Sequence, residues 1–77
     1  MDIANLVKMA NQIGDYFEAW PDQAEASLEI ASHLRRFWAP AMRSELLRHV
    51  DENCGEGLKD LVLSSIRQHR DKLEAHA

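Results

Sequence analysis

The folding pattern of this chain centres on one segment, Ile30-Ala31-Ser32-His33-Leu34-Arg35-Arg36-Phe37-Trp38-Ala39-Pro40-Ala41-Met42-Arg43. It combines apolar residues at helical spacing with a cluster of arginines, two adjacent aromatic residues and a proline. Proline lacks a backbone N–H and disfavours helical geometry in the residue before it, so a helix through His33 should end by Ala39. Pro40 can then open the next helix, where its missing N–H is not needed. The segment therefore predicts a tight corner between two helices, with Phe37 and Trp38 packed in the angle.

Helical periodicity on both sides of this corner predicts four helices, over about residues 2–19, 23–38, 40–53 and 58–73. The pattern Asp22 with Glu25 three residues later is a capping box that starts the second helix, and Gly55 after the third is typical of a left-handed helix end. The first helix carries a stripe at spacings of three and four: Ile3, Leu6, Ala10, Ile13, Phe17 and Trp20. No strand-like alternation occurs. The expected fold is all-α, one small domain of four short helices in a bundle over residues 1–77.

Length and composition narrow the class of protein. A chain of 77 residues buries only about 60 to 65% of its extended surface, so a partner polypeptide is expected to supplement its core. The single cysteine, Cys54, cannot form an intramolecular disulfide and fits a reducing cytoplasm, where we expect an inert core thiol. Neither a signal peptide nor an apolar run of membrane-spanning length is visible, so no membrane contact is expected.

Charge is segregated along the sequence. The net charge of −4 argues against nucleic-acid binding, which depends on clustered Lys and Arg. Residues 1–32 carry one base and six acids, residues 33–49 carry four arginines and one acid, and residues 50–77 carry four bases and six acids. The corner is thus a basic island of net charge +3 between acidic ends. Such an island suits either an acidic partner surface or internal pairing with the chain's own acids.

Two helices carry more apolar surface than one core requires. The apolar residues of the second helix cover an arc of about 180°, whereas one core-facing stripe needs about 100°. On the first helix Met9, Tyr16 and Trp20 follow a flank with few charges, which is compatible with a contact surface. Corner aromatics serve the fold more often than a partner, so both roles remain open for Phe37 and Trp38.

No constellation of residues points to catalysis. His33, His49, His69 and His76 are not spaced as metal ligands, and Cys54 has no base on its own face. The glycines of Gly55-Glu56-Gly57 follow no strand and match no phosphate-binding pattern. The sequence predicts no catalytic, cofactor-binding or metal-binding residue and therefore a chain that is not itself an enzyme.

Three blocks carry a resemblance to a known family. They are Leu6-Val7-Lys8-Met9-Ala10-Asn11-Gln12-Ile13, the corner segment from Ile30 to Arg43, and Gly55-Glu56-Gly57-Leu58. In this order they resemble the delta subunit of the soluble, NAD-dependent, molybdenum-containing formate dehydrogenases of bacteria. The family's corner often reads Phe-Trp-Asp-Pro-Arg-Met-Arg, and here Ala39 and Ala41 replace the aspartate and the first arginine. Any ion pair made by those two family positions is therefore lost.

The resemblance implies a subunit without its own cofactor. It would bind the alpha subunit, which holds the molybdenum cofactor, and support assembly or stability of the complex. We expect contacts from a set of residues at the corner and on the first helix: His33, Arg36, Phe37, Trp38, Met42, Arg43, Met9, Tyr16 and Trp20. Two other classes compete with this interpretation. One is a self-associating adaptor that forms a homodimer, and the other is a maturation factor absent from the finished enzyme.

Overall fold

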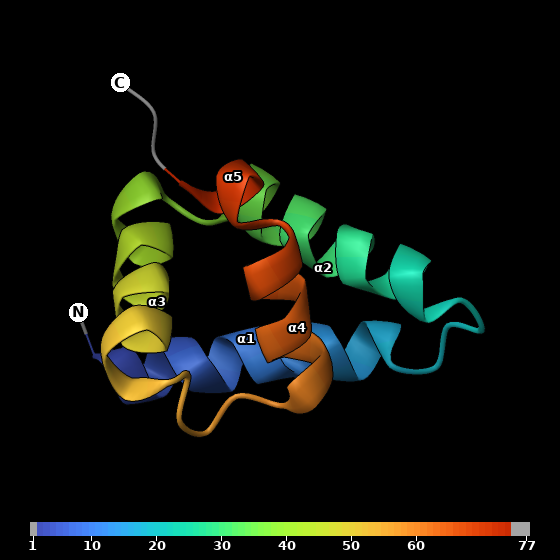
Figure 1. The fold of residues 1–77 in the computed structure, drawn as a ribbon, viewed down its shortest axis with the longest axis horizontal. Coiled ribbons are helices and arrows are strands. Elements are labelled where there is room, and N and C mark those ends of the chain that lie inside the picture. Colours follow the sequence, from blue (N-terminus) through green and yellow to red (C-terminus); the bar gives the residue numbers. More distant parts are fainter. Residues whose placement is uncertain (1, 75–77) are drawn as a thin grey trace.

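Helices are the only regular secondary structure in the residues that the computed structural model describes, 2–74, which confirms the predicted all-α fold. The helices are α1 (Ile3–Phe17), α2 (Gln23–Phe37), α3 (Pro40–Asn53), α4 (Asp60–Gln68) and α5 (Arg70–Leu73). Figure 1 shows α1 and α2 joined by a turn at one end of the molecule, with α3 closing the other end. His76, the last histidine considered above, lies outside the described residues.

Helix starts follow from local chemistry. The side chain of Asp22 accepts hydrogen bonds from the backbone N–H groups of Ala24 and Glu25, which have no partner within α2. Asp2 caps α1 in the same way through Ala4. Ala39 precedes Pro40 in extended geometry and offers no side-chain cap, so α3 starts through its proline alone.

The C-terminal part differs from the single helix expected over residues 58–73. The chain becomes helical at Asp60 and is interrupted at His69, where the backbone leaves helical geometry at φ −117° and ψ 33°. The short α5 then places Leu73, which is 1% exposed, among the core residues. The end of α3 also differs from expectation, because Cys54 itself adopts a left-handed conformation and is exposed rather than in the core.

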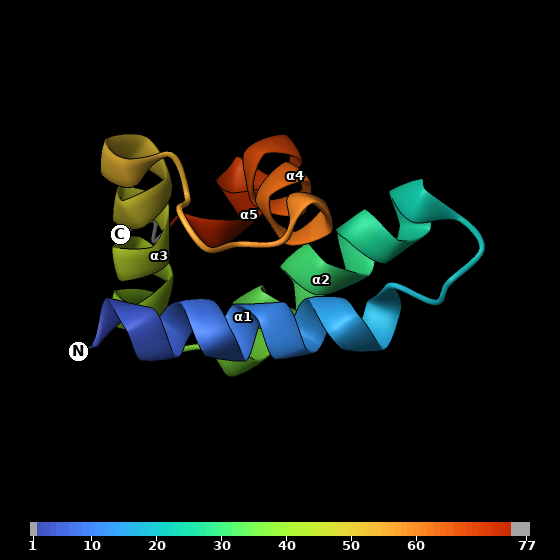
Figure 2. The same ribbon diagram turned by 90° about the horizontal axis from the view of Figure 1, so that it is seen from below.

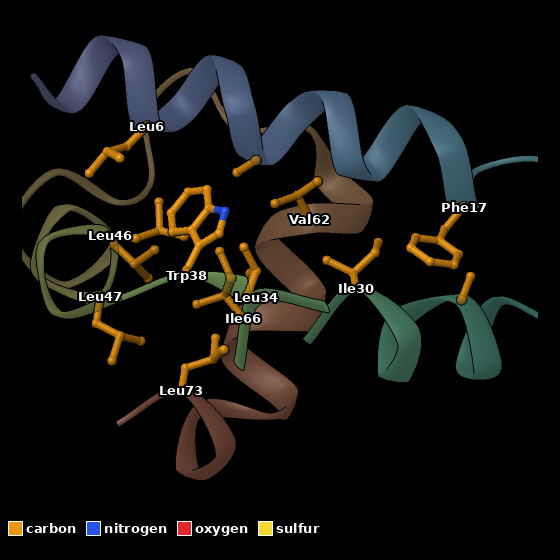
Figure 3. Packing of buried hydrophobic residues seen from close by; sticks show 13 residues of the cluster. Leu6, Phe17, Ile30, Leu34, Trp38, Leu46, Leu47, Val62, Ile66 and Leu73 are labelled. Atoms are coloured by element: carbon orange, nitrogen blue, oxygen red, sulfur yellow. The ribbon is translucent and has the colours of Figure 1, made fainter. Parts of the chain in front are cut away.

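The core lies between α2 and the helices around it. Ile30, Ala31 and Leu34 of α2 are completely buried, and α2 packs against α1, α4 and α5. The wide apolar arc of α2 is therefore explained in large part by a central position in the bundle. Figure 3 shows Trp38 directed at α1 among Leu6, Leu46 and Leu34, so the residue that follows α2 joins both ends of the core.

The layering leaves one side of α1 and α2 uncovered. Figure 2 shows α4 and α5 on one side of α1, and on the opposite side only the end of α2 reaches past α1. On the covered side, a buried serine of α4 joins α2, since Ser65 Oγ donates to the carbonyl of Ser27. Gly14 lets α4 approach α1 closely, because a Cβ atom at this position would lie 2.4 Å from Cγ2 of Val62. The molecule thus has one closed side and one open side.

Candidate interaction surface

The corner turns its two aromatic residues in opposite directions. Phe37 is the last residue of α2 and is 68% exposed, whereas Trp38 is 6% exposed and belongs to the core. The backbone changes at Trp38 to extended geometry, with φ −90° and ψ 138°, so the two side chains no longer follow one helical face. The expectation that both aromatics pack in the angle is correct for Trp38 and wrong for Phe37.

A groove lies between α1 and α2 on the open side of the molecule. Its volume is about 560 Å³, and its lining is mainly apolar: Met9, Gln12, Ile13, Tyr16, Phe17, His33 and Trp38. Tyr16 at its edge is 71% exposed, although its ring makes an edge-to-face contact with Phe17 at 4.9 Å between centroids. Exposed aromatic residues beside an apolar groove are typical of a binding surface rather than of solvated helices.

The exposed aromatic surface continues from the groove to the end of α2. The centroids of the His33 and Phe37 rings lie 4.7 Å apart, and the Arg36 guanidinium carbon lies 5.7 Å from the centroid of the Phe37 ring. Arg36 forms no ion pair with a described residue. We call this surface the α1/α2 face and define it by the groove residues together with Arg36 and Phe37. It unites six of the residues predicted from the sequence: Met9, Tyr16, His33, Arg36, Phe37 and Trp38.

The other three predicted residues lie away from the groove. Arg43 points to α5, where its Nη1 lies 3.5 Å from the carbonyl oxygen of Lys72, and its buried Nε has no hydrogen-bond partner. Met42 packs against the core, and Trp20 packs edge-to-face on Phe17 at 5.2 Å. These three side chains therefore have internal contacts that account for their position.

The basic island is divided by the fold. Arg35 donates to the same Lys72 carbonyl at 2.8 Å, so two arginines meet the C-terminal end of α5, where cations are favourable. Arg48 pairs with Glu52 one turn further along α3, which raises the pKa of its guanidinium. Pairing with the chain's own acids, one of the two alternatives for this island, thus holds for Arg48 alone. Arg35 and Arg43 contact a backbone carbonyl instead, and Arg36 is left on the open side.

The groove also holds a polar group without a partner. The indole N–H of Trp38 makes no hydrogen bond with any residue from 2 to 74, and Trp38 lines the groove. Arg43 Nε is the only fully buried side-chain nitrogen or oxygen without a partner among residues 2–74, so the indole N–H is not sealed from solvent in the free chain. Sequence reasoning missed this group, as it missed Gln12, Ile13 and Phe17 as groove residues. The low charge of the α1 flank was the signal that could have included Gln12.

A second depression lies on the closed side and differs in chemistry. Its volume is about 830 Å³, and it is lined by residues in or beside α1, α2 and α4, including Glu18, Ser27, Lys59 and Gln68. Several of its polar groups have partners: Lys59 pairs with Asp15 and Glu18, and Ser27 donates to Gln68 at 3.0 Å. The hydrogen bond with Asp15 raises the pKa of the Lys59 ammonium. These contacts hold α1, α2 and α4 together.

Metal ligands do not gather in the part of the chain that the structure describes. No three side chains among its His, Cys, Asp and Glu residues are placed to hold an ion together. None of the helices between residues 2 and 74 has the length and apolar character needed to cross a membrane.

Fold and surface together define a small helical protein with an open aromatic face between its first two helices. Comparison with known families identifies it further. The profile of the NADH-dependent formate dehydrogenase delta subunit family, FdsD, matches residues 5–66, and the chain belongs to this family. The matched region includes most of α1, all of α2 and α3 and most of α4, and therefore the whole α1/α2 face. No curated protein and no solved structure gives a significant match.

Proposed function

We propose that this delta subunit is a non-catalytic accessory chain that binds the alpha subunit of an NAD-dependent formate dehydrogenase and supports its assembly or stability. Alpha is the subunit expected to hold the molybdenum cofactor. The observation that carries the proposal is the α1/α2 face, because a formate dehydrogenase subunit that exposes Tyr16 and Phe37 this far has a surface suited to another chain. We infer that the complex works in the bacterial cytoplasm, which suits the unpaired thiol of Cys54.

The mechanism follows from mass action. A chain that binds the folded, cofactor-loaded alpha subunit and not its unfolded form stabilises it by RT ln(1 + [L]/Kd), about 2.7 kcal/mol at a hundredfold excess over Kd. The same binding would stabilise the small delta chain. No chemistry by the delta side chains is required, and the contacts that we assign to the alpha subunit are Met9, Tyr16, His33, Arg36 and Phe37.

The test compares formate dehydrogenase complexes purified from cells that contain or lack the delta chain. We expect the complex without delta to hold less molybdenum per alpha subunit and to unfold at a lower temperature. Added delta chain should restore the unfolding temperature in a saturable way. Equal molybdenum content and equal unfolding temperature in the two preparations would refute the proposal.

The same material distinguishes the two competing functions. A maturation factor would be found with complexes that lack molybdenum and would be missing from the finished enzyme. A self-associating adaptor would give a mass of twice 8.8 kDa by light scattering and would not bind the complex. A delta chain that remains bound to active, molybdenum-loaded enzyme fits neither alternative.

A further inference from the structure

We propose that the groove of the α1/α2 face receives an acidic segment of the alpha subunit, which inserts one bulky apolar side chain and offers a hydrogen-bond acceptor to Trp38. This inference rests on the proposed function, because it takes the alpha subunit as the partner and adds where and by what chemistry that partner is recognised.

The apolar part of the occupant follows from the groove lining. Its walls are formed by thioether, aliphatic and aromatic side chains, and Tyr16 stands at its edge. A volume of about 560 Å³ accommodates a large side chain together with part of the backbone that carries it. Aromatic or aliphatic anchors that fill such pockets provide most of the binding energy in protein interfaces.

The acceptor follows from the unpartnered indole. Trp38 is 6% exposed, and its N–H has no acceptor among residues 2–74 but is not sealed from solvent in the free chain. A docked segment that excludes water from the groove must supply an oxygen atom to this donor, since an unsatisfied buried N–H is costly. A backbone carbonyl or a carboxylate of the partner meets this need.

The negative charge follows from the groove's own electrostatics. Among the residues that line it there is no Asp or Glu, His33 is one of its walls, and the unpaired Arg36 stands beside Phe37. A second copy of this chain fits less well. In an isologous dimer two identical α1/α2 faces meet, so both Arg36 side chains lie in one interface. The groove lining provides no acidic side chain to pair with them. An acidic alpha segment pairs with Arg36 instead.

The first experiment changes charge inside the groove without removing contact area. Gln12 is exposed and lines the groove, so Gln12→Glu adds a negative charge where the acidic segment would lie. The full-length chain, labelled at the exposed Cys54, is titrated with the complex purified without delta. We expect Gln12→Glu to weaken binding roughly threefold to tenfold at low salt and Gln12→Lys to strengthen it, with both effects reduced at high salt.

The matched control is Gln23→Glu. Gln23 is also exposed but lies at the start of α2 beside the polar depression of the closed side, where an acid suits the helix end. The affinity of the Gln23→Glu chain for the complex should equal that of the unchanged chain. Tyr16→Ala and Phe37→Ala should each weaken binding about tenfold or more, and Leu28→Ala, which removes another exposed apolar side chain outside the groove, should not.

The second experiment tests the indole donor. Chemical synthesis of the chain allows Trp38→β-(3-benzothienyl)alanine, which keeps the bicyclic ring and replaces the N–H by sulfur. The free chain should unfold as before, whereas its affinity for the complex should fall roughly threefold to tenfold, because one hydrogen bond is lost. The same replacement at Trp20, outside the groove lining, should leave affinity unchanged.

The outcomes separate this inference from the proposed function. Tight binding that is indifferent to changes at Gln12, Tyr16 and Trp38 would overturn the groove assignment and leave the proposed function intact. Stronger binding by Gln12→Glu and weaker binding by Gln12→Lys would show a basic occupant and also overturn it. A dimer that dissociates on Tyr16→Ala would assign the groove to a second copy. Failure of the unchanged chain to bind would refute the proposed function as well.

Discussion

Gly14 is the position where a single methyl group should disturb the fold most sharply. In Gly14→Ala the new Cβ atom would lie 2.4 Å from Cγ2 of Val62, whereas non-bonded carbon atoms prefer about 3.5 to 4.0 Å. Val62 is completely buried, and a β-branched side chain in a helix has one strongly preferred rotamer, so Val62 cannot turn away freely. Relief of the clash requires α1 and α4 to separate.

The magnitude comes from two opposing terms. Alanine is favoured over glycine within a helix by about 1 kcal/mol, whereas an extra methyl group in a packed core costs about 1 to 3 kcal/mol. We therefore expect Gly14→Ala to lower the free energy of unfolding by about 1 kcal/mol, and the melting temperature by roughly 4 to 8 °C for a chain of this size. A lower free energy of unfolding shows that the steric clash dominates, whereas a higher one shows that the helix propensity of alanine dominates.

A double-mutant cycle with Val62→Ala makes the test specific. Val62→Ala alone should cost about 2 kcal/mol, because two buried methyl groups are lost. In that background the methyl group of Gly14→Ala no longer meets Cγ2, so the substitution should become stabilising by up to about 1 kcal/mol. Urea unfolding followed by far-ultraviolet circular dichroism measures all four corners of the cycle. Stabilisation by Gly14→Ala in both backgrounds would refute the close packing of α1 on α4.

Three further predictions follow from the contacts above. Trp38→Ala should lower the free energy of unfolding by about 3 to 5 kcal/mol, but Phe37→Ala, one residue earlier and largely exposed, should change it by less than about 0.5 kcal/mol in urea unfolding. Asn11→Ala should lower the free energy of unfolding by about 1 to 3 kcal/mol in the same assay, because the Asn11 amide donates to the Gly57 carbonyl and accepts from the Lys59 N–H, both at 2.9 Å. The control is Asn5→Ala, at an exposed position of the same helix, which should cost less. The bidentate contact with Arg70 lowers the pKa of the Asp51 carboxyl. The pair therefore adds stability above the ordinary carboxyl pKa of about 3.9 and loses it as pH falls through the lower folded value. In Asp51→Asn the free energy of unfolding should depend less on pH below about pH 4, and an unchanged slope would contradict the pairing.

The parts of the fold that sequence reasoning could reach are those set by neighbours along the chain. α2 starts after Asp22 because that side chain reaches backbone N–H groups two and three residues ahead, and α3 starts at Pro40 because proline has no N–H to lose. The interruption at His69 has no such local signal, since neither glycine nor proline stands there. It is accompanied by a distant contact, the packing of Leu73 in the core.

The candidate surface was predictable in composition but not in geometry. Residue types and spacing identified Tyr16 and Phe37 as surplus to one core, and the family resemblance added His33. They could not show that Arg43 reaches the carbonyl of Lys72, a contact across 29 residues, or that Trp38 turns inward while Phe37 turns outward. Both outcomes depend on where α5 packs and on one backbone torsion at the corner, and neither is encoded in helical periodicity.

The position of Trp38 links the stability of the free chain to the occupancy of its groove. The same indole closes the core against Leu46 and Leu34 and forms the floor on which a partner would lie. In a chain this short, where the core alone supplies little stability, any ligand that orders the groove also restrains the corner between α2 and α3. Binding and folding should then be coupled in both directions. A partner that satisfies the Trp38 donor raises the unfolding temperature of the delta chain, and substitutions that loosen the corner weaken binding without touching the contact surface.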